Sequence, residues 1–363
     1  MVMLLDRTDL ASRVRDRAVD LAGIVTTPLL PADYLDLLNP LRAGSELRGR
    51  IAEIRPETRD AATIFIEPGR DWAGHVPGQY IRIGLDIDGV RQWRAYSLTS
   101  STDSSDGRIA ITVKAIPGGV VSNFLVRRAR AGMLVHLDQA CGDFVLPDPA
   151  PAKTLFVSAG SGVTPVVGMI RNRLTELGDV VVVHSAPTPE DAIFGGELRM
   201  LASRGRLTLF ERHTDAAGTM SPAELERLVP DFAERESWAC GPTAMLDALQ
   251  KHWEADGIVE RLHTERFRPT VFATGDGGSA AFTESDVEIE VDGATSLLDA
   301  GEGAGVLMPS GCRMGICFGC VAPLREGTVR DLRNGELTTA APGDGVLVQT
   351  CVSAAAGRCE IEL

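Results

Sequence analysis

The sequence predicts three domains of different fold class: an antiparallel β-barrel, an α/β domain with a parallel sheet, and a small α+β domain that binds a metal cluster. Short alternating strands between turn signals predict the barrel. Buried strands followed by helical stretches predict the α/β domain, and a group of cysteines near the end of the chain predicts the metal site. At 363 residues the chain is long enough for two or three domains.

Residues 1–45 are expected to form a helical N-terminal extension. Its apolar side chains recur at helical spacing on one face, and charged residues surround them. Such a stripe packs on the rest of the protein or lies on a membrane surface, and the mixed charge of the polar face favours packing. The stripe consists of Leu10, Val14, Ala18, Leu21 and Val25.

Residues 46–148 show the pattern of an all-β domain. Two alternating runs, Ile81–Leu85 and Ile109–Val113, are separated by turn signals such as Asp88-Gly89. Closely spaced antiparallel strands of this kind predict a barrel.

The predicted barrel carries two groups of polar residues. Arg94 and Tyr96 fall on alternate positions of a strand and so share one face, while Ser97 and Thr99 add hydroxyls. These side chains suit a phosphate and a ring system, although a half-exposed strand is the simpler interpretation. A second anion site is expected where Lys114 precedes a glycine turn that opens a helix. The turn contributes Gly118, Gly119 and Ser122.

The α/β pattern runs over residues 151–268. Leu155–Ser158 and Val180–His184 have the pattern of buried parallel strands, each followed by a helical stretch. The loop after the first strand opens a helix, so its N–H groups and the helix dipole favour an anion such as a pyrophosphate. The loop departs from the G-x-G-x-x-G fingerprint, which argues against an ordinary Rossmann site. The loop residues are Gly160, Ser161, Gly162, Thr164 and Pro165.

A second candidate site in the α/β domain is Cys240-Gly241-Pro242, which ends a short strand before a helix. In open α/β sheets ligands bind at the carboxyl ends of the strands, so this position suits a bound molecule. For Cys240 alone, a buried small side chain is the alternative interpretation.

Residues 269–285 are expected to be a flexible linker because of their glycine-rich composition. Residues 286–363 follow as the third domain. Three of its cysteines are spaced C-x4-C-x2-C, and a fourth comes after thirty intervening residues, which is the plant-type ferredoxin arrangement for a [2Fe–2S] cluster. A zinc site usually pairs two C-x2-C knuckles, and only one such pair is present here. The expected ligands are Cys312, Cys317, Cys320 and Cys351.

The charge of the chain is strongly negative, with 36 basic and 50 acidic residues and a formal net charge of −14. This excess argues against a nucleic-acid partner. Residues 286–363 hold twelve acidic residues against five arginines, so half of the excess lies there. An acidic surface on a small electron carrier suits docking to a basic patch on its acceptor.

The other signals concern location. Seven cysteines, four of them in one metal signature, fit a reducing compartment. No signal-peptide core and no apolar run of about 20 residues is seen. The sequence therefore predicts a cytoplasmic protein that contacts a membrane only through a partner or through its N-terminal helix.

The order and spacing of these motifs resemble the ferredoxin–NADP reductase superfamily. The resemblance covers residues 46–363, from Arg94-x-Tyr96-Ser97 through Gly160–Pro165 to Cys240-Gly241-Pro242. The appended cysteine domain resembles the β-grasp-like ferredoxin domain of multidomain reductases that serve oxygenases and fatty-acyl desaturases. The extension and the linker are most similar to actinobacterial-type reductases that feed electrons to membrane acyl-CoA desaturases.

The resemblance implies roles for the barrel residues in holding a flavin. Arg94 would pair the flavin phosphate, Tyr96 would contact the isoalloxazine, and Ser97 would hydrogen-bond near its N5. Gly119 and Ser122 would cradle the flavin phosphates from the second turn. The flavin implied is FAD, with FMN as the alternative.

The resemblance also implies roles in the second domain. Gly160, Gly162 and Thr164 would hold the nicotinamide nucleotide, and Cys240 would align its C4 with the flavin N5. Two further residues, Glu265 and Phe267, match the end of the reductase module near the flavin. Glu265 is a candidate for proton handling, with a structural salt bridge as the alternative.

The nucleotide is expected to be NADPH rather than NADH. A 2′-phosphate needs a hydroxyl and arginines beyond the second strand, and Ser185 with Arg204, Arg206 or Arg212 could supply them. The predicted function is electron transfer from NADPH through FAD and the [2Fe–2S] cluster to a terminal iron enzyme. A desaturase is the first candidate and a ring-hydroxylating or other oxygenase the second. A redox sensor without nicotinamide turnover is the alternative of another class. Arg313, inside the cluster loop, is expected to tune the cluster, dock the acceptor or remain solvated.

Overall fold

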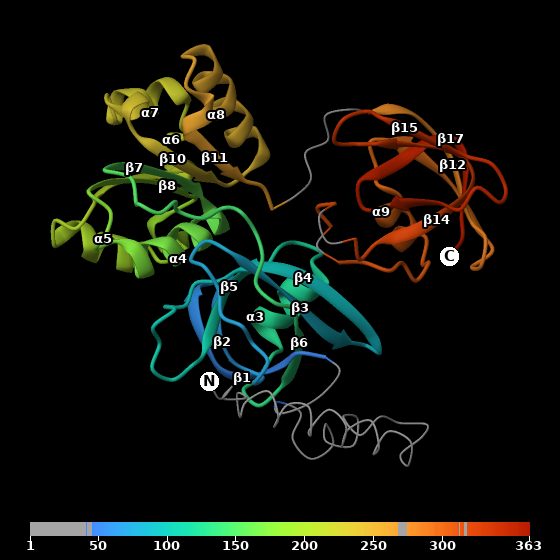
Figure 1. Cartoon of the computed structure of the whole chain (residues 1–363), viewed down its shortest axis with the longest axis horizontal. Coiled ribbons are helices and arrows are strands. Elements are labelled where there is room, and N and C mark those ends of the chain that lie inside the picture. The colour runs from blue at the N-terminus through green and yellow to red at the C-terminus, as the bar shows by residue number, and fades with distance from the viewer. Residues whose placement is uncertain (1–40, 42–45, 268–273, 312, 316–317) are drawn as a thin grey trace, which may run out of the picture.

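The computed structural model describes residues 41, 46–267, 274–311, 313–315 and 318–363. Its strands form three separate sheets, and each sheet is the centre of one domain (Figure 1). The helical extension predicted for residues 1–45 lies, apart from Leu41, outside the described residues. No helix within the described part of the chain is long and apolar enough to cross a membrane.

The first domain is an antiparallel barrel of six strands in the order β4-β3-β6-β1-β2-β5. An antiparallel bridge between Leu98 and Ile111 joins the end of β4 to β5 and closes the sheet on itself. The helix α3 (Val120–Arg127) inserts Val121 and Leu125 into the barrel core. The strands are β1 (Arg48–Thr58), β2 (Ala61–Pro68), β3 (Tyr80–Ile87), β4 (Val90–Ser97), β5 (Ile109–Lys114) and β6 (Leu134–Leu137).

The second domain is a parallel sheet in the order β11-β10-β7-β8-β9. Alternate residues of its strands supply two separate cores, as expected for a sheet covered on both faces. Phe156 packs with α4 and α5 on one face, and Leu155 packs with α7 and α8 on the other. The strands are β7 (Lys153–Ala159), β8 (Asp179–Ala186), β9 (Thr208–His213), β10 (Glu236–Cys240) and β11 (Leu262–Glu265). The helices are α4 (Val163–Arg173), α5 (Gly195–Ser203), α6 (Thr214–Ala217), α7 (Pro222–Leu228) and α8 (Thr243–Ala255).

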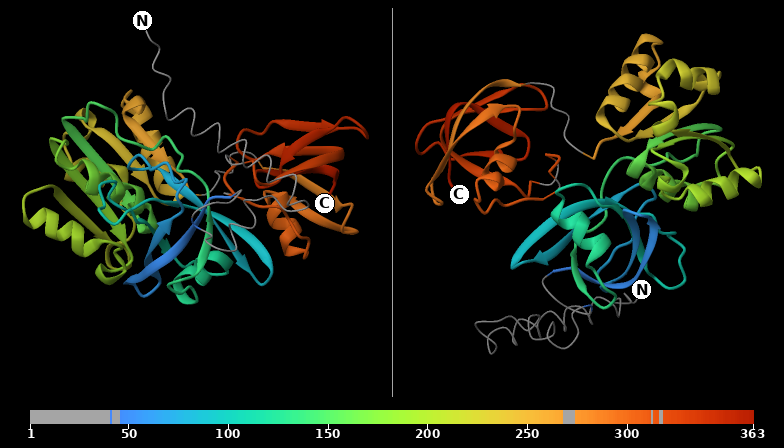
Figure 2. Two further views of the ribbon diagram at one scale, coloured as in Figure 1. Left: turned by 60° about the horizontal axis from the view of Figure 1, so that its bottom comes forward. Right: turned by 180° about the vertical axis from the view of Figure 1, so that it is seen from behind.

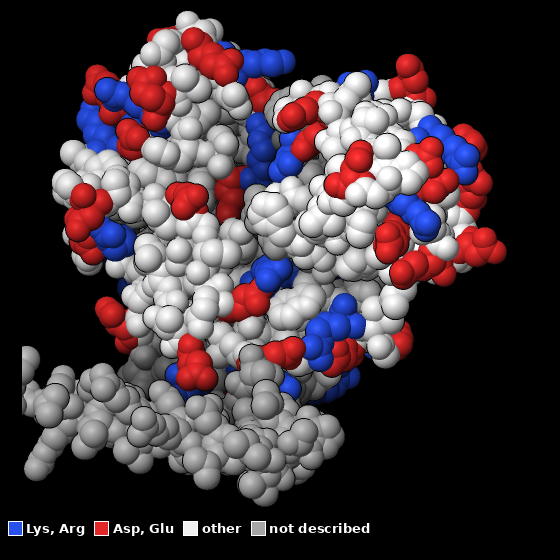
Figure 3. Space-filling model, turned by 45° about the vertical axis from the view of Figure 1, so that its right-hand side comes forward, with Lys and Arg blue, Asp and Glu red and all other residues white. Residues whose placement is uncertain are grey.

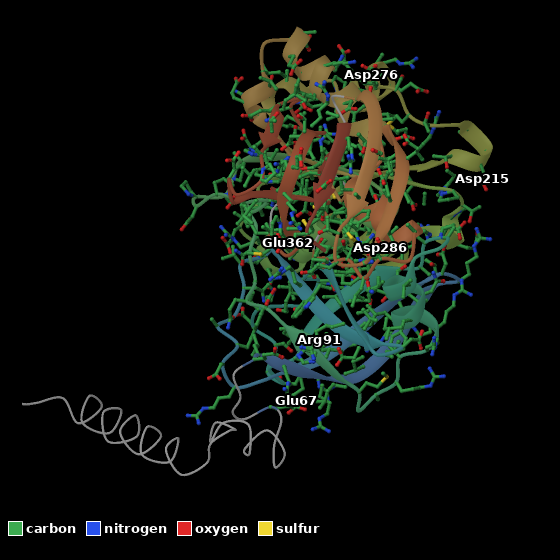
Figure 4. All side chains as sticks on the ribbon, turned by 90° about the vertical axis from the view of Figure 1, so that its right-hand side faces the viewer. Glu67, Arg91, Asp215, Asp276, Asp286 and Glu362 are labelled. Atoms are coloured by element: carbon green, nitrogen blue, oxygen red, sulfur yellow. The ribbon has the colours of Figure 1, made fainter. Side chains whose placement is uncertain are left out.

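The third domain is a mixed sheet in the order β13-β12-β17-β14-β15, with β16 paired to β14 and one helix, α9 (Leu297–Gly303), among the described residues. Its first strand, β12, runs parallel to its last, β17. Figure 4 shows Asp276, at the start of β12, and Asp286, beyond its end, at opposite ends of this domain. The strands are β12 (Gly275–Phe282), β13 (Val287–Gly293), β14 (Val321–Asp331), β15 (Leu337–Ala340), β16 (Val346–Gln349) and β17 (Ser353–Ile361).

The prediction of a linker over residues 269–285 is wrong for Gly275–Phe282, because β12 occupies that stretch. The glycines that suggested a linker form an irregularity in the strand pairing between Gly275 and Gly278. A Cβ on Gly278 would lie 2.0 Å from the carbonyl oxygen of Gly357, so glycine is needed there for close strand approach. Beyond the irregularity, Ala280 and Phe282 are fully buried in the core of the third domain.

The third domain lies beside the barrel, with α9 and the start of β14 turned toward β3 and β4 (Figures 1 and 2). The α/β domain contacts the barrel from another side. Asn172 on α4 reaches the barrel directly, since its Nδ2 donates to the carbonyl oxygen of Ser100 at 3.0 Å. The barrel is therefore the central body, and both other domains meet it.

Candidate functional site

A cleft of about 1320 Å³ lies where the three domains approach one another. Its size exceeds that of most small-molecule pockets, which span about 300–1,000 Å³, and suits a dinucleotide-sized ligand. The cleft brings together residues that lie as far apart in sequence as Arg94 and Cys351. The predicted site residues that line it are Arg94, Tyr96, Ser97, Lys114, Gly118, Gly119, Ser122, Ser161, Thr164, Glu265, Phe267 and Cys351.

Arg94 offers a cation to the cleft from strand β4. Its Nη1 donates to the carbonyl oxygen of Trp93 at 2.7 Å, which is the only hydrogen bond of this guanidinium within the described residues. Burial, and then the positive charge of Arg313, lowers the pKa of Arg94. Four of the five guanidinium donors thus remain for an anionic ligand.

Ser97 carries the clearest sign of an absent partner. The residue is only 3% exposed, and its Oγ is buried without a hydrogen-bond partner within the described residues. An unsatisfied buried hydroxyl costs about 1–3 kcal/mol, so a ligand that accepts or donates here would stabilise the site. Its neighbour Tyr96 is deeply placed as well, and burial raises the pKa of the Tyr96 phenol.

The glycine turn before α3 forms another wall of the cleft. Gly118 adopts φ +70°, and a Cβ at this position would meet no atom within 4 Å, so the turn is open to the cleft. The hydroxyl of Ser122 supports the turn from within, because it accepts from the Ile116 amide at 3.3 Å and donates to the Gly119 carbonyl at 3.5 Å. The phosphate site predicted at this turn would therefore be formed by backbone groups, and the Ser122 side chain stabilises the turn through hydrogen bonds.

Two polar residues predicted for the barrel site are engaged elsewhere. Lys114 lines the cleft, but its Nζ forms an ion pair with Asp60 at 2.8 Å. Thr99 is fully buried and does not line the cleft. Leu98 pairs with Ile111 to close the barrel, and the Thr99 hydroxyl forms a hydrogen bond with the Thr112 hydroxyl at 3.3 Å.

The glycine loop of the α/β domain is the short 3-10 turn η1 (Gly160–Gly162) at the carboxyl end of β7. Gly160 adopts φ +55° with no atom within 4 Å of a Cβ position, which leaves this end of the sheet open. A Cβ on Gly162 would lie 2.1 Å from the carbonyl oxygen of Cys240, so only glycine lets the two loops touch. Thr164 holds the turn by donating to the Ser161 carbonyl at 2.9 Å.

The other residues of this edge lie beside the cleft rather than in its lining. They come from the carboxyl ends of neighbouring parallel strands and from the helices that follow, so they share the open edge of the sheet. This group consists of Gly160, Gly162, Pro165, Ser185, Cys240, Gly241 and Pro242.

Cys240 and Glu265 stand opposite each other at the ends of the parallel strands β10 and β11. Cys240 is fully buried, and burial, followed by the charge of Glu265, raises the pKa of its thiol. Glu265 lines the cleft, and its Oε2 is buried without a hydrogen-bond partner in the described structure. Burial raises the pKa of Glu265 to about 8, so this carboxyl is mostly protonated at neutral pH.

The residues predicted to bind a 2′-phosphate, Ser185 with Arg204, Arg206 or Arg212, do not all lie at the same edge of the sheet. Ser185 pairs in register with Arg212 at the carboxyl ends of β8 and β9. Arg204 and Arg206 precede β9 and therefore lie at the opposite edge of the sheet. Arg212 donates to the Gly218 carbonyl at 2.9 Å, so one of the three arginines is held beside Ser185.

His184 was not predicted as a site residue. Its Nδ1 lies 2.9 Å from the Ser158 hydroxyl on the neighbouring strand, directly below the glycine turn, and its Nε2 is buried without a partner among the described residues. Burial lowers the pKa of His184 to about 4, so the ring is neutral. A single buried histidine within an apolar strand gives no sequence signal that separates it from an ordinary core residue.

Two of the four predicted cluster ligands are described. Cys320 and Cys351 are buried, and Thr350 ties their segments together because its Oγ1 donates to the Cys320 carbonyl at 2.9 Å. Cys312 and Cys317 lie outside the described residues. The separate segment that carries Cys351 thus approaches the cysteine loop, as a four-thiolate cluster requires.

Comparison with protein families gives three matches along the chain. They are an oxidoreductase FAD-binding domain over residues 62–146, an oxidoreductase NAD-binding domain over residues 156–251, and a 2Fe-2S iron-sulfur cluster binding domain over residues 282–356. A curated relative from Mycobacterium tuberculosis, an "NADPH oxidoreductase", is 49% identical over 350 residues, which cover 94% of this chain and 91% of the relative. The chain belongs to the ferredoxin–NADP reductase superfamily.

Other relatives of this reductase are components of oxygenases. The glycine betaine monooxygenase reductase subunit of Pseudomonas aeruginosa is 30% identical over 87% of this chain and 96% of its own length. The ferredoxin reductase component of 3-ketosteroid-9-alpha-monooxygenase from Mycolicibacterium smegmatis is 31% identical over 77% of this chain and 86% of its own length. The reductase is thus an oxidoreductase with FAD, a pyridine nucleotide and a [2Fe–2S] cluster as cofactors.

Solved structures show the same fold. Phthalate dioxygenase reductase matches with a TM-score of 0.56 at 22% identity and covers 88% of this chain and 98% of its own. A ferredoxin NADP+ reductase from Neisseria gonorrhoeae matches with a TM-score of 0.54 at 20% identity, over 61% of this chain and 99% of its own. The predicted fold class, an antiparallel barrel, an α/β domain with a parallel sheet and a ferredoxin domain, is therefore confirmed.

Proposed function

We propose that the reductase takes electrons from NADPH and delivers them one at a time to a terminal iron enzyme. The observation that carries the proposal is the shared cleft, where Ser97 and Glu265 from the two reductase domains meet Cys351 from the ferredoxin domain. When bound, FAD accepts the two electrons of a hydride and releases them singly, and the [2Fe–2S] cluster carries one electron at a time.

In this proposal the barrel residues hold the flavin. The donors of Arg94 and the open backbone of the Gly118 turn suit its phosphates. Tyr96 would pack against the flavin ring, and a ring nitrogen would supply the hydrogen-bond partner that the Ser97 hydroxyl lacks in the protein. The residues present therefore fit the group, because a buried hydroxyl without a partner and a cation with free donors both line the cleft.

The α/β domain orients the nucleotide. The open turn at Gly160 receives the pyrophosphate, and Thr164 keeps that turn in shape. Cys240 closes the end of the sheet beside the nicotinamide and excludes water there. Glu265 holds a proton at a buried oxygen next to this position, so it can supply a proton at neutral pH.

NADPH is favoured over NADH by two observations. Ser185 and Arg212 lie side by side at the nucleotide edge of the sheet, where a hydroxyl and a cation suit a 2′-phosphate. The relative that is 49% identical is named an NADPH oxidoreductase. Arg212 is bound by the Gly218 and Ala217 carbonyls and by Glu224, so it would exchange these partners for the phosphate while the strand pairing stays unchanged.

The terminal acceptor is a membrane fatty-acyl desaturase or an oxygenase. The resemblance of the N-terminal extension to desaturase-serving reductases supports the first, which would bring the protein to the cytoplasmic face of a membrane. The monooxygenase names of two relatives support the second. Acidic side chains gather over the ferredoxin domain (Figure 3), and exposed Glu288, Glu290 and Asp292 on β13 suit either partner if it presents a basic surface.

Anaerobic titration of the purified holoprotein with NADPH, and separately with NADH, tests the donor and the cofactor order. We expect NADPH at low excess to bleach both the flavin and the iron–sulfur absorbance. Bleaching by NADH alone would refute the NADPH assignment. If neither nucleotide reduced a bound flavin, the reductase function would fail and a redox sensor would replace it.

A matched pair of serine variants tests the flavin site. Ser97→Ala is expected to slow flavin reduction by NADPH about 10²-fold, since loss of one preorganised hydrogen-bond donor at a reacting group costs ~10²–10³-fold in rate. Ser100→Ala is the control, because the Ser100 Oγ is also buried without a partner in the described structure but lies outside the cleft lining. Equal rates in the two variants would contradict the assignment of Ser97.

Reconstitution tests the acceptor. The reduced holoprotein is mixed with a desaturase in lipid vesicles or with an oxygenase, and product formation per NADPH consumed is measured. Coupled turnover with the desaturase alone supports the first candidate, and coupled turnover with the oxygenase alone replaces it with the second.

A further inference from the structure

Three charged residues of the ferredoxin domain face the proposed flavin site. Asp299 and Glu302 stand on α9, and Arg313 lies in the loop that follows, inside the predicted cysteine motif. All three line the same cleft as Arg94 of the barrel. We call Arg313, Asp299 and Glu302 the Arg313 triad.

Arg313 binds both carboxylates of the triad. Its Nη1 lies 3.1 Å from the Asp299 Oδ1, and its Nη2 forms an ion pair with the Glu302 Oε1. The Arg313 side chain is 25% exposed, and its Nε is buried without a hydrogen-bond partner in the described structure. The main contacts of this partly buried side chain are therefore the two carboxylates of α9.

The charges of the Arg313 triad affect the pKa of Arg94 in the neighbouring barrel domain. The pKa of Arg94 is lowered first by burial and then by Arg313, whereas Glu302 and Asp299 act in the opposite direction. Glu302 is 31% exposed and Asp299 is 61% exposed, so solvent screens Glu302 less. The charges of the ferredoxin domain, with Glu302 foremost, therefore reach the cation proposed to hold the flavin phosphate.

The arrangement raises a problem that Arg313 solves. A flavin nucleotide is anionic, and two carboxylates in the wall of its cleft oppose its binding. With Arg313 in place, the triad carries a net charge of −1, and without Arg313 it would carry −2. The carboxylates would then also compete with the flavin phosphate for Arg94.

We propose that Arg313 is a charge-compensating residue for flavin binding, which offsets one of the two negative charges of Glu302 and Asp299 so that the phosphate site at Arg94 stays open to an anion. The ferredoxin domain thus contributes to flavin affinity as well as to electron transfer. This inference rests on the proposed function, because it takes the flavin phosphate to lie at Arg94.

The test is a charge cycle in the full-length, cluster-loaded protein, with FAD as the probe. The dissociation constant of FAD is measured by the recovery of flavin fluorescence on release. Arg313→Gln is expected to weaken FAD binding about tenfold at low salt, with a smaller difference at high salt because the effect is electrostatic. Glu302→Gln in the presence of Arg313 is expected to bind FAD at least as tightly as the wild type.

The double variant, Arg313→Gln with Glu302→Gln, decides the mechanism. Its triad again carries −1, so its FAD affinity is expected to return to near the wild-type value. If Arg313→Gln weakened binding by damaging the cysteine loop, removal of a carboxylate would not restore it, and iron content would fall. A double variant as weak as Arg313→Gln therefore overturns the proposal.

Two controls separate the remaining explanations. Arg358→Gln removes the same charge from the same domain, but Arg358 pairs with Glu360 at 3.0 Å outside the cleft lining. A loss of affinity in Arg358→Gln equal to that in Arg313→Gln would overturn the proposal in favour of overall domain charge. Arg94→Ala tests the flavin position itself: unchanged FAD affinity in this variant would refute the proposed function at Arg94, whatever Arg313→Gln shows.

Discussion

Glu265→Gln is expected to stabilise the protein in a pH-dependent way. The folded state raises the pKa of this carboxyl from 4.5 to about 8 through burial. Between these values the folded state binds the proton more tightly than the unfolded state, so the free energy of unfolding falls as pH rises. With ~1.4 kcal/mol for each pH unit, the loss is about 3 kcal/mol at pH 7 and about 5 kcal/mol above pH 8.

Glutamine keeps the shape of the protonated carboxyl and does not ionise, so this loss is absent in the variant. Thermal unfolding of wild type and variant is compared at pH 5 and pH 8. At pH 5 we expect a difference below about 1 kcal/mol. At pH 8 we expect a gain on the order of 10 °C, since a folding unit of about 150–250 residues shifts by ~2–4 °C per kcal/mol and the barrel and the α/β domain together span residues 46–267. Glu254→Gln, at an exposed position on α8, is the control and should shift neither midpoint. An equal difference at both pH values would refute a buried, proton-holding Glu265.

Two further substitutions test the packing and the cluster. Gly162→Ala is expected to destabilise the α/β domain by about 1–3 kcal/mol and raise the KM for NADPH, because its Cβ would collide with the Cys240 carbonyl at 2.1 Å. Gly196→Ala, where no atom lies within 4 Å, should instead stabilise the domain by ~0.4–1 kcal/mol in the same melting assay. Cys351→Ser should remove the cluster absorbance and abolish cytochrome c reduction while sparing flavin-dependent ferricyanide reduction. Unchanged cytochrome c reduction would contradict an electron route through the ferredoxin domain.

The sequence was most informative where function depends on the backbone. The glycine turns at Gly118 and Gly160 could be predicted because glycine adopts positive φ angles, such as theirs, at the least steric cost. Cys240 could be placed at the end of its strand because short apolar runs before a Gly-Pro turn end there. The spacing of the cysteines is enough by itself to indicate a two-iron cluster, since it reflects how one loop and one separate segment share four thiolates.

The errors and omissions have a common cause, which is that tertiary contacts override local pattern. Thr99 was expected beside Ser97 at the candidate site, but it lies beyond the end of β4, where barrel closure at Leu98 and the contact with Thr112 bury it outside the cleft. Glycines near Gly278 resembled a linker, because close strand pairing and flexibility favour the same residue. Asp299 and Glu302 could not be linked to Arg94, since no local signal fixes how one domain faces another.

The pairing of β12 with β17 has a consequence for how the protein is made. The first strand of the ferredoxin domain pairs early with β13, but its second partner, β17, comes about 70 residues later, and Cys351 lies two residues before that strand. The barrel and the α/β domain are complete by Glu265, so they can fold on the emerging chain and take up their flavin early. The flavin site can therefore form before the cluster site is complete, and a shortage of cluster assembly would then leave a protein that holds its flavin but lacks the route from flavin to acceptor.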